Sequence, residues 1–197
     1  MGSVTRELAQ HKMRIQNYEG PRLVSFVGEI GSGKSTAAKY LVEHYGFTYV
    51  RFAGPLKDML KAIGLTHAQV DGDQKEVPCE LLGGRTPRFA MQTLGSEWGR
   101  DCIGPDFWRN LWVDQVRTIL NHGGRVVVDD CRFGNEDHAI RYLDGIHIRL
   151  DRRFPITDST HVSESYKVVA NGGVIHNLGS KDCLFDRIDN LLTLASK

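Results

Sequence analysis

The segment GEIGSGKST, residues 28–36, restricts the fold more than any other part of the chain. It matches the pattern G-x-x-x-x-G-K-[ST] at every fixed position, and it lies between the apolar run LVSFV and the helix-like run STAAKYLVEHYG. Its glycines let the backbone curl so that successive N–H groups point at one anion, and the following helix adds the positive end of its dipole. The sequence therefore predicts a phosphate-binding P-loop between a strand and a helix.

The side chains of this loop have distinct expected roles. Lys34 is expected to bridge the β- and γ-phosphates of ATP, and the Ser35 hydroxyl to bind Mg²⁺. The other residues expected to bind ATP through the loop are Gly28, Gly31, Ser32, Gly33 and Thr36. A glycine-rich turn with a solvated lysine is the alternative, and the flanking strand and helix disfavour it. ATP and Mg²⁺ are thus the predicted donor and cofactor.

Composition argues against several other classes of protein. The 197 residues fit one domain, with or without a small inserted lobe, and the formal net charge of +1 gives no broad attraction to nucleic acid or membranes. No apolar run approaches the roughly 20 residues that span a bilayer. The cysteines lack metal-site spacing, which favours reduced thiols and a cytoplasmic protein (host cytoplasm if phage-encoded). Residues 1–21 form a polar leader, expected to be disordered or partly a tag.

Apolar runs alternate with helical patterns along the rest of the chain. Strands are expected at 22–28, 47–54, 125–130, 145–150 and 172–177, and helices at 35–46, 55–64, 87–98, 106–121, 135–143 and 183–195. Strands that are apolar throughout are typical of a parallel sheet covered on both faces. The pattern predicts a P-loop NTPase-like, three-layer α/β/α fold over 22–197, with a core of 22–64 and 124–197. It also predicts an inserted helical lobe at about 65–123 and a short lid at about 151–167.

Charged residues follow two of the predicted strands. Asp129 and Asp130 come after RVVV, where an acid could bind Mg²⁺ or its water shell, and spacing alone does not separate the two. A helix-capping turn is the alternative for this pair. Arg132 comes next, and Arg152 and Arg153 precede a polar loop. These arginines suit an anionic substrate or the charge on a transferring phosphoryl group.

Several segments together resemble the deoxynucleoside monophosphate kinases, a family best known from bacteriophages within the P-loop nucleoside monophosphate kinase superfamily. In the family's order, they are GEIGSGKST, FAGPLKDML, RFAMQTLGSEWGR, DFWRNLW, DDCRF, HVSE and IHNLGS. They cover nearly all of the chain from Leu23 onward. The resemblance implies transfer of the ATP γ-phosphoryl group to a 2′-deoxynucleoside 5′-monophosphate, which supplies DNA precursors. The chain departs from many relatives at Gly134, where they have proline.

The resemblance also implies catalytic and donor-site roles by position. The D-x-R spacing aligns Asp130, rather than Asp129, with the family's acid, so that Ser35 and Asp130 form the expected metal pair. The implied catalytic set is Lys34, Asp130, Arg132, Arg152 and Arg153. Asn177 and Gly179 match the loop near the ATP adenine.

The same resemblance places an acceptor pocket in QTLGSEWGRDCIGPDFW, residues 92–108. Gln92, Gly95 and Ser96 match the stretch that lines it, with Trp108 as the aromatic wall. A base offers a flat face and polar edges, so Trp98 or Trp108 would stack on it and Gln92 would meet its edge. The expected substrate-binding set is completed by Lys57, Arg88, Asp130, Arg132, His161 and Glu164, the last two in the lid. Core packing is the alternative for each tryptophan, and Arg100 is the alternative to Arg88 as phosphate ligand.

Two other functions fit parts of the sequence. One is a P-loop kinase of another small phosphorylated acceptor, of the dephospho-coenzyme A or phosphomevalonate type, and the stretch QTLGSEWGR disfavours it. The other is a non-catalytic ATP-binding regulatory module, which would need neither lid arginines nor a second pocket. The expected partners are small molecules, without nucleic acid or membrane, and the resemblance leaves a homodimer open.

Overall fold

The computed structural model describes residues 18–152 and 168–194 and divides the chain into two compact units. The core unit combines Met1–Val50 with Gln115–Lys197, and the inserted unit is Arg51–Asp114. The insertion was expected at about 65–123, whereas the compact unit begins directly after the second strand. The physical reason is that the helix after this strand packs its Leu56 and Leu60 into the core of the inserted unit.

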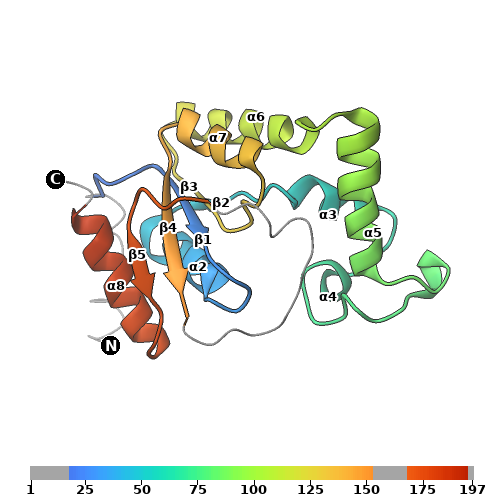
Figure 1. The fold of residues 1–197 in the computed structure, drawn as a ribbon, viewed down its shortest axis with the longest axis horizontal. Coiled ribbons are helices and arrows are strands. Elements are labelled where there is room, and N and C mark those ends of the chain that lie inside the picture. The colour runs from blue at the N-terminus through green and yellow to red at the C-terminus, as the bar shows by residue number, and fades with distance from the viewer. Residues whose placement is uncertain (1–17, 153–167, 195–197) are drawn as a thin grey trace, which may run out of the picture. The chain divides into compact units, whose positions relative to one another are not determined.

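Within the described part of the core unit, five strands form one parallel sheet in the order β2-β3-β1-β4-β5 (Figure 1). Their bounds are β1 Leu23–Val27, β2 Thr48–Tyr49, β3 Val126–Val128, β4 Ile146–Asp151 and β5 Val174–His176. The central β1 is buried along its whole length, as its uniformly apolar sequence predicts. The predicted α/β fold with a parallel sheet is confirmed. β2 is shorter than the expected 47–54 because the chain leaves the core unit at Arg51.

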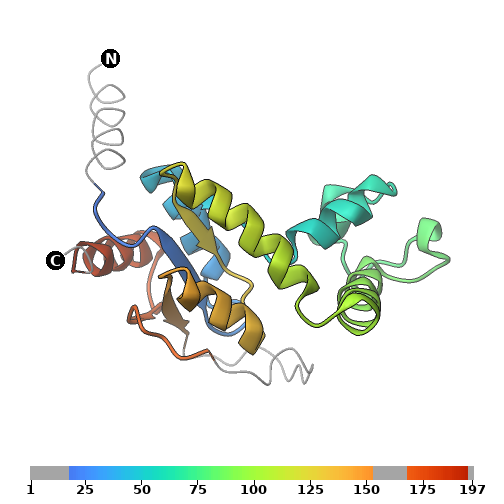
Figure 2. The ribbon, with the colours of Figure 1, turned by 90° about the horizontal axis from the view of Figure 1, so that it is seen from above.

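Helices cover both faces of this sheet. On one face, Val24 and Phe26 of β1 pack with residues of α2 (Lys34–Tyr45) and α8 (Lys181–Leu194). Both views show α8 beside β5 (Figure 1, Figure 2). Successive strand residues point to opposite faces, so His147 of β4 points away from these helices. It contacts α7 (Gly134–Tyr142), which therefore covers the other face and completes the three layers.

A buried polar cluster joins α7 to the segment that leads into β5. His147 is fully buried, and its Nε2 lies 2.8 Å from Asp137 Oδ1, which also accepts a hydrogen bond from Arg141 Nε. Burial outweighs the attraction of Asp137 and lowers the pKa of His147 to about 4. The backbone N–H of His147 donates to Asn171 Oδ1 at 2.7 Å, and Arg141 donates to the Val169 carbonyl. These contacts hold the approach to β5 against the sheet.

The inserted unit is helical and has its own core. Its elements are α3 Gly54–Ala62, α4 His67–Val70, a 3-10 turn Glu80–Leu82, α5 Pro87–Thr93, a π-helix Leu94–Ile103 and the first half of α6 Phe107–Asn121. Residues 65–86, where no individual helix was expected, contain α4, whose first turn Thr66 caps by accepting from Gln69 N–H. Leu56, Leu60, Leu65, Val70 and Trp108 form the buried core. No helix in the described residues is long and apolar enough to span a membrane.

The helix expected at 87–98 changes its winding at Leu94. From there to Ile103 the chain is a π-helix, and the hydrogen bond from Gly104 N–H to the Gly99 carbonyl, at 3.1 Å, spans five residues. π geometry occurs mostly as single-turn bulges, often at functional sites. This longer π-helix coincides with the segment in which the sequence places an acceptor pocket.

Candidate functional site

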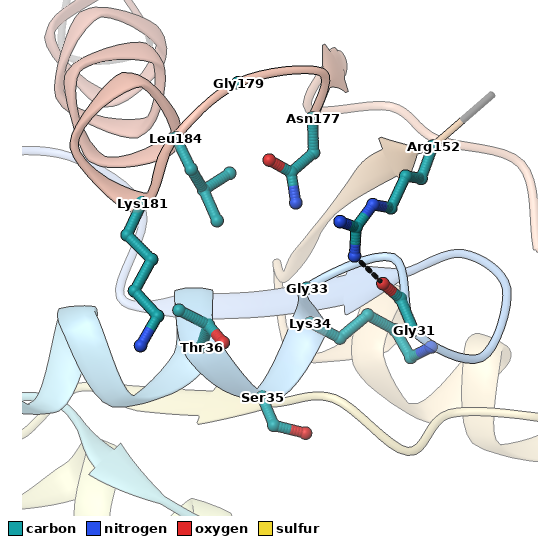
Figure 3. Close-up of a pocket in the computed structure, with 10 residues that line it drawn as sticks. All are labelled: Gly31, Gly33, Lys34, Ser35, Thr36, Arg152, Asn177, Gly179, Lys181 and Leu184. Carbon is teal, nitrogen blue, oxygen red and sulfur yellow. Dashed lines mark hydrogen bonds between the residues drawn. The ribbon is translucent and has the colours of Figure 1, made fainter. Parts of the chain in front are cut away.

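A cavity of about 390 Å³ lies over the glycine-rich loop of the core unit (Figure 3). Its walls come from this loop and the start of α2, from the residue after β4, and from the segment between β5 and α8. The lining residues are Gly31, Gly33, Lys34, Ser35, Thr36, Arg152, Asn177, Gly179, Lys181 and Leu184. All of these except Lys181 and Leu184 are site residues predicted from the sequence. Both lie on the first turn of α8, and Lys181 precedes the helix start that was expected at residue 183.

Close packing explains two of the loop's glycines. Gly28 and Gly33 have positive φ angles of 143° and 103°, which L side chains rarely adopt. A Cβ atom at Gly28 would lie 2.3 Å from the Leu150 carbonyl oxygen, and one at Gly33 would lie 2.6 Å from Asn177 Nδ2. Asn177 Nδ2 also donates to the Ser32 carbonyl at 2.8 Å. The segment after β5 thus braces the loop directly.

The polar groups of the loop fit a phosphate chain. Lys34 Nζ donates to the carbonyls of Gly28 at 2.7 Å and Glu29 at 2.8 Å, so the ammonium lies inside the curl of the loop. The buried hydroxyl of Ser32 has no hydrogen-bond partner among the described residues. Such a buried group is normally paired, so a ligand oxygen is a natural partner for it. The loop therefore combines an ammonium group with a buried hydroxyl that no described residue satisfies.

The structure distinguishes the two aspartates after β3. Ser35 Oγ donates to Asp129 Oδ2 at 2.6 Å, and Asp129 is 7% exposed. The expected metal pair was Ser35 with Asp130. In the structure, the carboxylate that accepts the hydrogen bond from Ser35 belongs to Asp129. The physical reason is that β3 ends at Val128, so the next residue is the one that reaches the start of α2.

The donor set at this position suits Mg²⁺. The described residues contain no group of three or more His, Cys, Asp and Glu side chains that could hold a metal ion. Mg²⁺ in nucleotide sites needs only one or two protein ligands, because phosphate oxygens and waters complete its octahedron. The pair of Ser35 and Asp129 meets this need.

The expected catalytic arginines lie at different places. Arg132 is exposed, on a turn fixed by Glu136, whose Oε2 accepts the backbone N–H groups of Arg132 at 2.8 Å and Phe133 at 3.2 Å. Arg152 Nη1 donates to the Gly31 carbonyl at 3.1 Å and so lies over the loop (Figure 3). Arg153 lies outside the described residues, and so do His161 and Glu164, which were expected in a lid.

In the inserted unit, the two candidate tryptophans differ in exposure. Trp108 is 2% exposed, belongs to the buried core, and donates from Nε1 to the Gly95 carbonyl at 2.8 Å. Trp108 was expected to form the aromatic wall of the acceptor pocket, with core packing as the alternative; because its ring is enclosed, we assign it to packing. Trp98 is 39% exposed and packs its edge against Phe107. Gln92 and Ser96, on the same helical stretch, are exposed.

The basic candidates of the inserted unit have different partners. Arg88 donates to Glu76 Oε1 at 2.7 Å, with both side chains largely exposed, and Arg100 donates to the Pro105 carbonyl. Lys57 is 13% exposed and lies in a cluster around Asp71. Asp71, Arg51 and Lys61 were not predicted from the sequence, because Asp71 follows α4 whereas Arg51 precedes α3 and both lysines lie on α3.

Gly99, rather than Gly95, is the glycine that close packing requires in this segment. A Cβ atom at Gly99 would lie 2.2 Å from Trp108 Nε1, whereas one at Gly95 would be 3.6 Å from Leu56 Cδ2, an ordinary contact. We expect Gly99→Ala to lower the free energy of unfolding by about 1–3 kcal/mol, the usual cost of overpacking. Gly95→Ala is the matched control. Urea unfolding followed by tryptophan fluorescence measures both, and equal stabilities would contradict the packing.

Comparisons with known proteins found a viral relative and a similar solved structure. No family model matches it. A protein of Acanthamoeba polyphaga mimivirus described as a "Putative deoxynucleotide monophosphate kinase" is 36% identical in an alignment of 154 residues, and the match covers 72% of this chain and 80% of that protein. A solved structure described as a "putative kinase" from Chloroflexus aurantiacus has 14% identity and a TM-score of 0.40, and it matches 68% of this chain. The chain spans 61% of that structure's length.

Proposed function

Because the chain belongs to the deoxynucleoside monophosphate kinase family, we propose that it transfers the γ-phosphoryl group of ATP, with Mg²⁺, to 2′-deoxynucleoside 5′-monophosphates. The family and the enzyme class predicted from the sequence, a nucleoside monophosphate kinase, are confirmed by the viral relative. The reaction would supply diphosphate precursors of DNA. A homodimer and a cytoplasmic location remain predictions of the sequence.

The observation that carries the proposal is the glycine-rich loop, residues 28–36, together with the hydrogen-bonded pair of Ser35 and Asp129. Lys34 would bind the β- and γ-phosphates from the position that its ammonium occupies inside the loop. Ser35 would bind Mg²⁺ through its hydroxyl, and Asp129 would hold the metal or a water bound to it. Mg²⁺ held there would supply positive charge to neutralise the β- and γ-phosphates.

No strong general base is required for this transfer. The attacking atom is an oxygen of the acceptor's own phosphate, which is already ionised at neutral pH. Catalysis then consists of in-line positioning and charge neutralisation. Arg152, over the glycine-rich loop, and the exposed Arg132 would neutralise charge on the phosphoryl group in transit.

The part of the cavity beyond the loop suits the nucleoside of the donor. Leu184 provides an apolar surface, and the backbone at Gly179 leaves space where a side chain would crowd Cys183. Asn177 and Lys181 provide polar groups at the edge (Figure 3). We therefore propose that the adenine and ribose of ATP bind here, with Lys181 and Leu184 added to the residues that the sequence indicated.

The acceptor base would bind to the inserted unit. The Trp98 side chain is 39% exposed and would stack on the base, and the amide of Gln92 both donates and accepts, so it could meet several base edges. Ser96 lies four residues after Gln92 on the same helical stretch. The mixed polar and aromatic character of residues 92–108 thus has two causes, since Trp108 serves packing and Trp98 serves binding.

A coupled ADP-release assay with ATP and Mg²⁺ tests the proposal. The panel of acceptors holds dTMP, dGMP, dCMP, dAMP, dUMP and the ribonucleotides. It also holds dephospho-coenzyme A and phosphomevalonate, the acceptors of the alternative P-loop kinases. We expect turnover on at least one deoxynucleotide, well above that on its ribonucleotide. Turnover on dephospho-coenzyme A or phosphomevalonate alone would identify another P-loop kinase. ATP binding with no phosphorylated product from any acceptor would favour a regulatory module.

A further inference from the structure

Asp71 lies at the centre of a cluster of cations in the inserted unit. Its side chain is 7% exposed, and the single atom Oδ1 lies 2.8 Å from Arg51 Nη1 and 2.9 Å from Lys57 Nζ. Oδ2 lies 3.2 Å from Lys61 Nζ. The cations come from the segment after β2 and from α3, whereas Asp71 follows α4. One carboxylate thus joins Arg51 to two lysines of α3 that lie one helical turn apart.

The cluster carries more positive than negative charge. Burial raises the pKa of Asp71, but hydrogen bonds from Lys57 and Arg51 outweigh it and hold the pKa well below its usual range. Burial, followed by repulsion from Lys57 and Arg88, lowers the pKa of the nearby Lys75. Positive charge removed from water is costly unless an anion balances it. A phosphate group would supply that balance.

Arg51 and Lys57 have the geometry of a shared phosphate site. Their nitrogens bond to the same oxygen atom, so they lie close together, and they remain partly accessible at 27% and 13%. A guanidinium binds phosphate oxygens in a fixed fork, and an ammonium binds them as a point charge. Left without a carboxylate between them, two cations this close would repel each other and move apart. A buried carboxylate that accepts hydrogen bonds from both cations keeps them close together.

We propose that Asp71 is a positioning residue that sets Arg51 and Lys57 to bind the phosphate group of the acceptor nucleotide. This inference rests on the proposed function and adds Arg51 and Asp71 to its acceptor site. Arg51 replaces Arg88 and Arg100 as the arginine on that phosphate, since Arg88 pairs with the exposed Glu76 at the surface. Asp71 itself touches no substrate.

The test compares Asp71→Asn with the wild-type protein in the ADP-release assay. The substitution keeps the shape of the side chain and removes its charge. With the deoxynucleotide that the wild type uses best, we expect the acceptor KM to rise by about tenfold or more, with a smaller change in kcat. The KM for ATP should stay within about twofold, since ATP binds to the core unit. A thermal melt checks that the variant is folded.

Two further variants separate positioning from simple support of the fold. Asp71→Glu restores the charge and should recover part of the acceptor KM. Asp58→Asn removes a 76% exposed carboxylate that pairs with Lys61 at 3.5 Å in the same region, and it should leave the KM unchanged. A role in folding alone would lower the melting temperature without a selective rise in the acceptor KM. That result would overturn the inference, and so would an unchanged KM in Asp71→Asn.

Failure of the inference can be told from failure of the proposed function. If the wild type phosphorylates a deoxynucleotide and Asp71→Asn matches its acceptor KM, only the role of Asp71 is refuted. If the wild type phosphorylates none of the panel, calorimetric titration with dTMP, dGMP, dCMP and dAMP decides the inference. Binding that Asp71→Asn weakens by about tenfold would support the phosphate site alone. Absence of binding, or equal binding by both proteins, would refute it.

Discussion

Replacing Lys34 with alanine is expected to lower turnover by about a thousandfold or more, because no other group in the loop carries charge to both phosphates. The wild-type ammonium bonds to the Gly28 and Glu29 carbonyls, inside the curl where the phosphates would lie. Alanine favours a helix, and Lys34 begins α2, so the variant should fold normally. Steady-state ADP release under saturating acceptor, with circular dichroism for folding, provides the measurement.

Lys39→Ala is the matched control for this substitution. Lys39 lies on the same helix, is exposed, and is not part of the cavity lining. It should retain nearly full turnover, so a general effect of charge loss on α2 would be visible. Turnover of Lys34→Ala within about tenfold of the wild type would contradict the assignment of the loop as the phosphate site.

The loop and the sheet could be predicted from the sequence because their signals are local. GEIGSGKST specifies a strand, a turn and a helix within a few residues, and the uniformly apolar β1 specifies burial on both faces. Asn177 and Gly179 could be placed near the loop only through the family resemblance. The structure gives Asn177 a physical reason, since its amide bonds to the Ser32 carbonyl. Lys181 and Leu184 were missed because a helix start beside the cavity has no separate sequence signal.

The inserted unit was harder to predict because its contacts join distant residues. The tryptophans Trp98 and Trp108 look alike in sequence, and only packing shows that Trp108 is enclosed. A signal existed in Gly99, since a glycine within a helical run often marks a close approach, and here it accommodates the Trp108 ring. Asp71 had no such signal. Its cations lie on other elements, so the cluster exists only once the unit has folded.

The choice between Asp129 and Asp130 is a case in which family spacing and geometry disagree. The D-x-R spacing favours Asp130, whereas the hydrogen bond from Ser35 reaches Asp129. Spacing identifies a residue by its distance from Arg132 along the chain. The hydrogen bond identifies it by its distance from the group expected to bind Mg²⁺. Because metal coordination depends on position in space, we give the geometry more weight for the metal role and keep Asp130 as a candidate for contact with the acceptor.

Asp129→Asn is accordingly expected to lower kcat by about a hundredfold or more and to raise the Mg²⁺ concentration needed for half-maximal rate. The asparagine carbonyl can still accept from the Ser35 hydroxyl, so the loop should keep its position while losing the negative charge. Asp130→Asn is the paired variant, expected to keep the Mg²⁺ dependence of the wild type. Titrating Mg²⁺ at fixed ATP in all three proteins measures both effects. The opposite pattern, with the shift in Asp130→Asn alone, would return the metal to Asp130 and leave Asp129 as an acid that only orients Ser35.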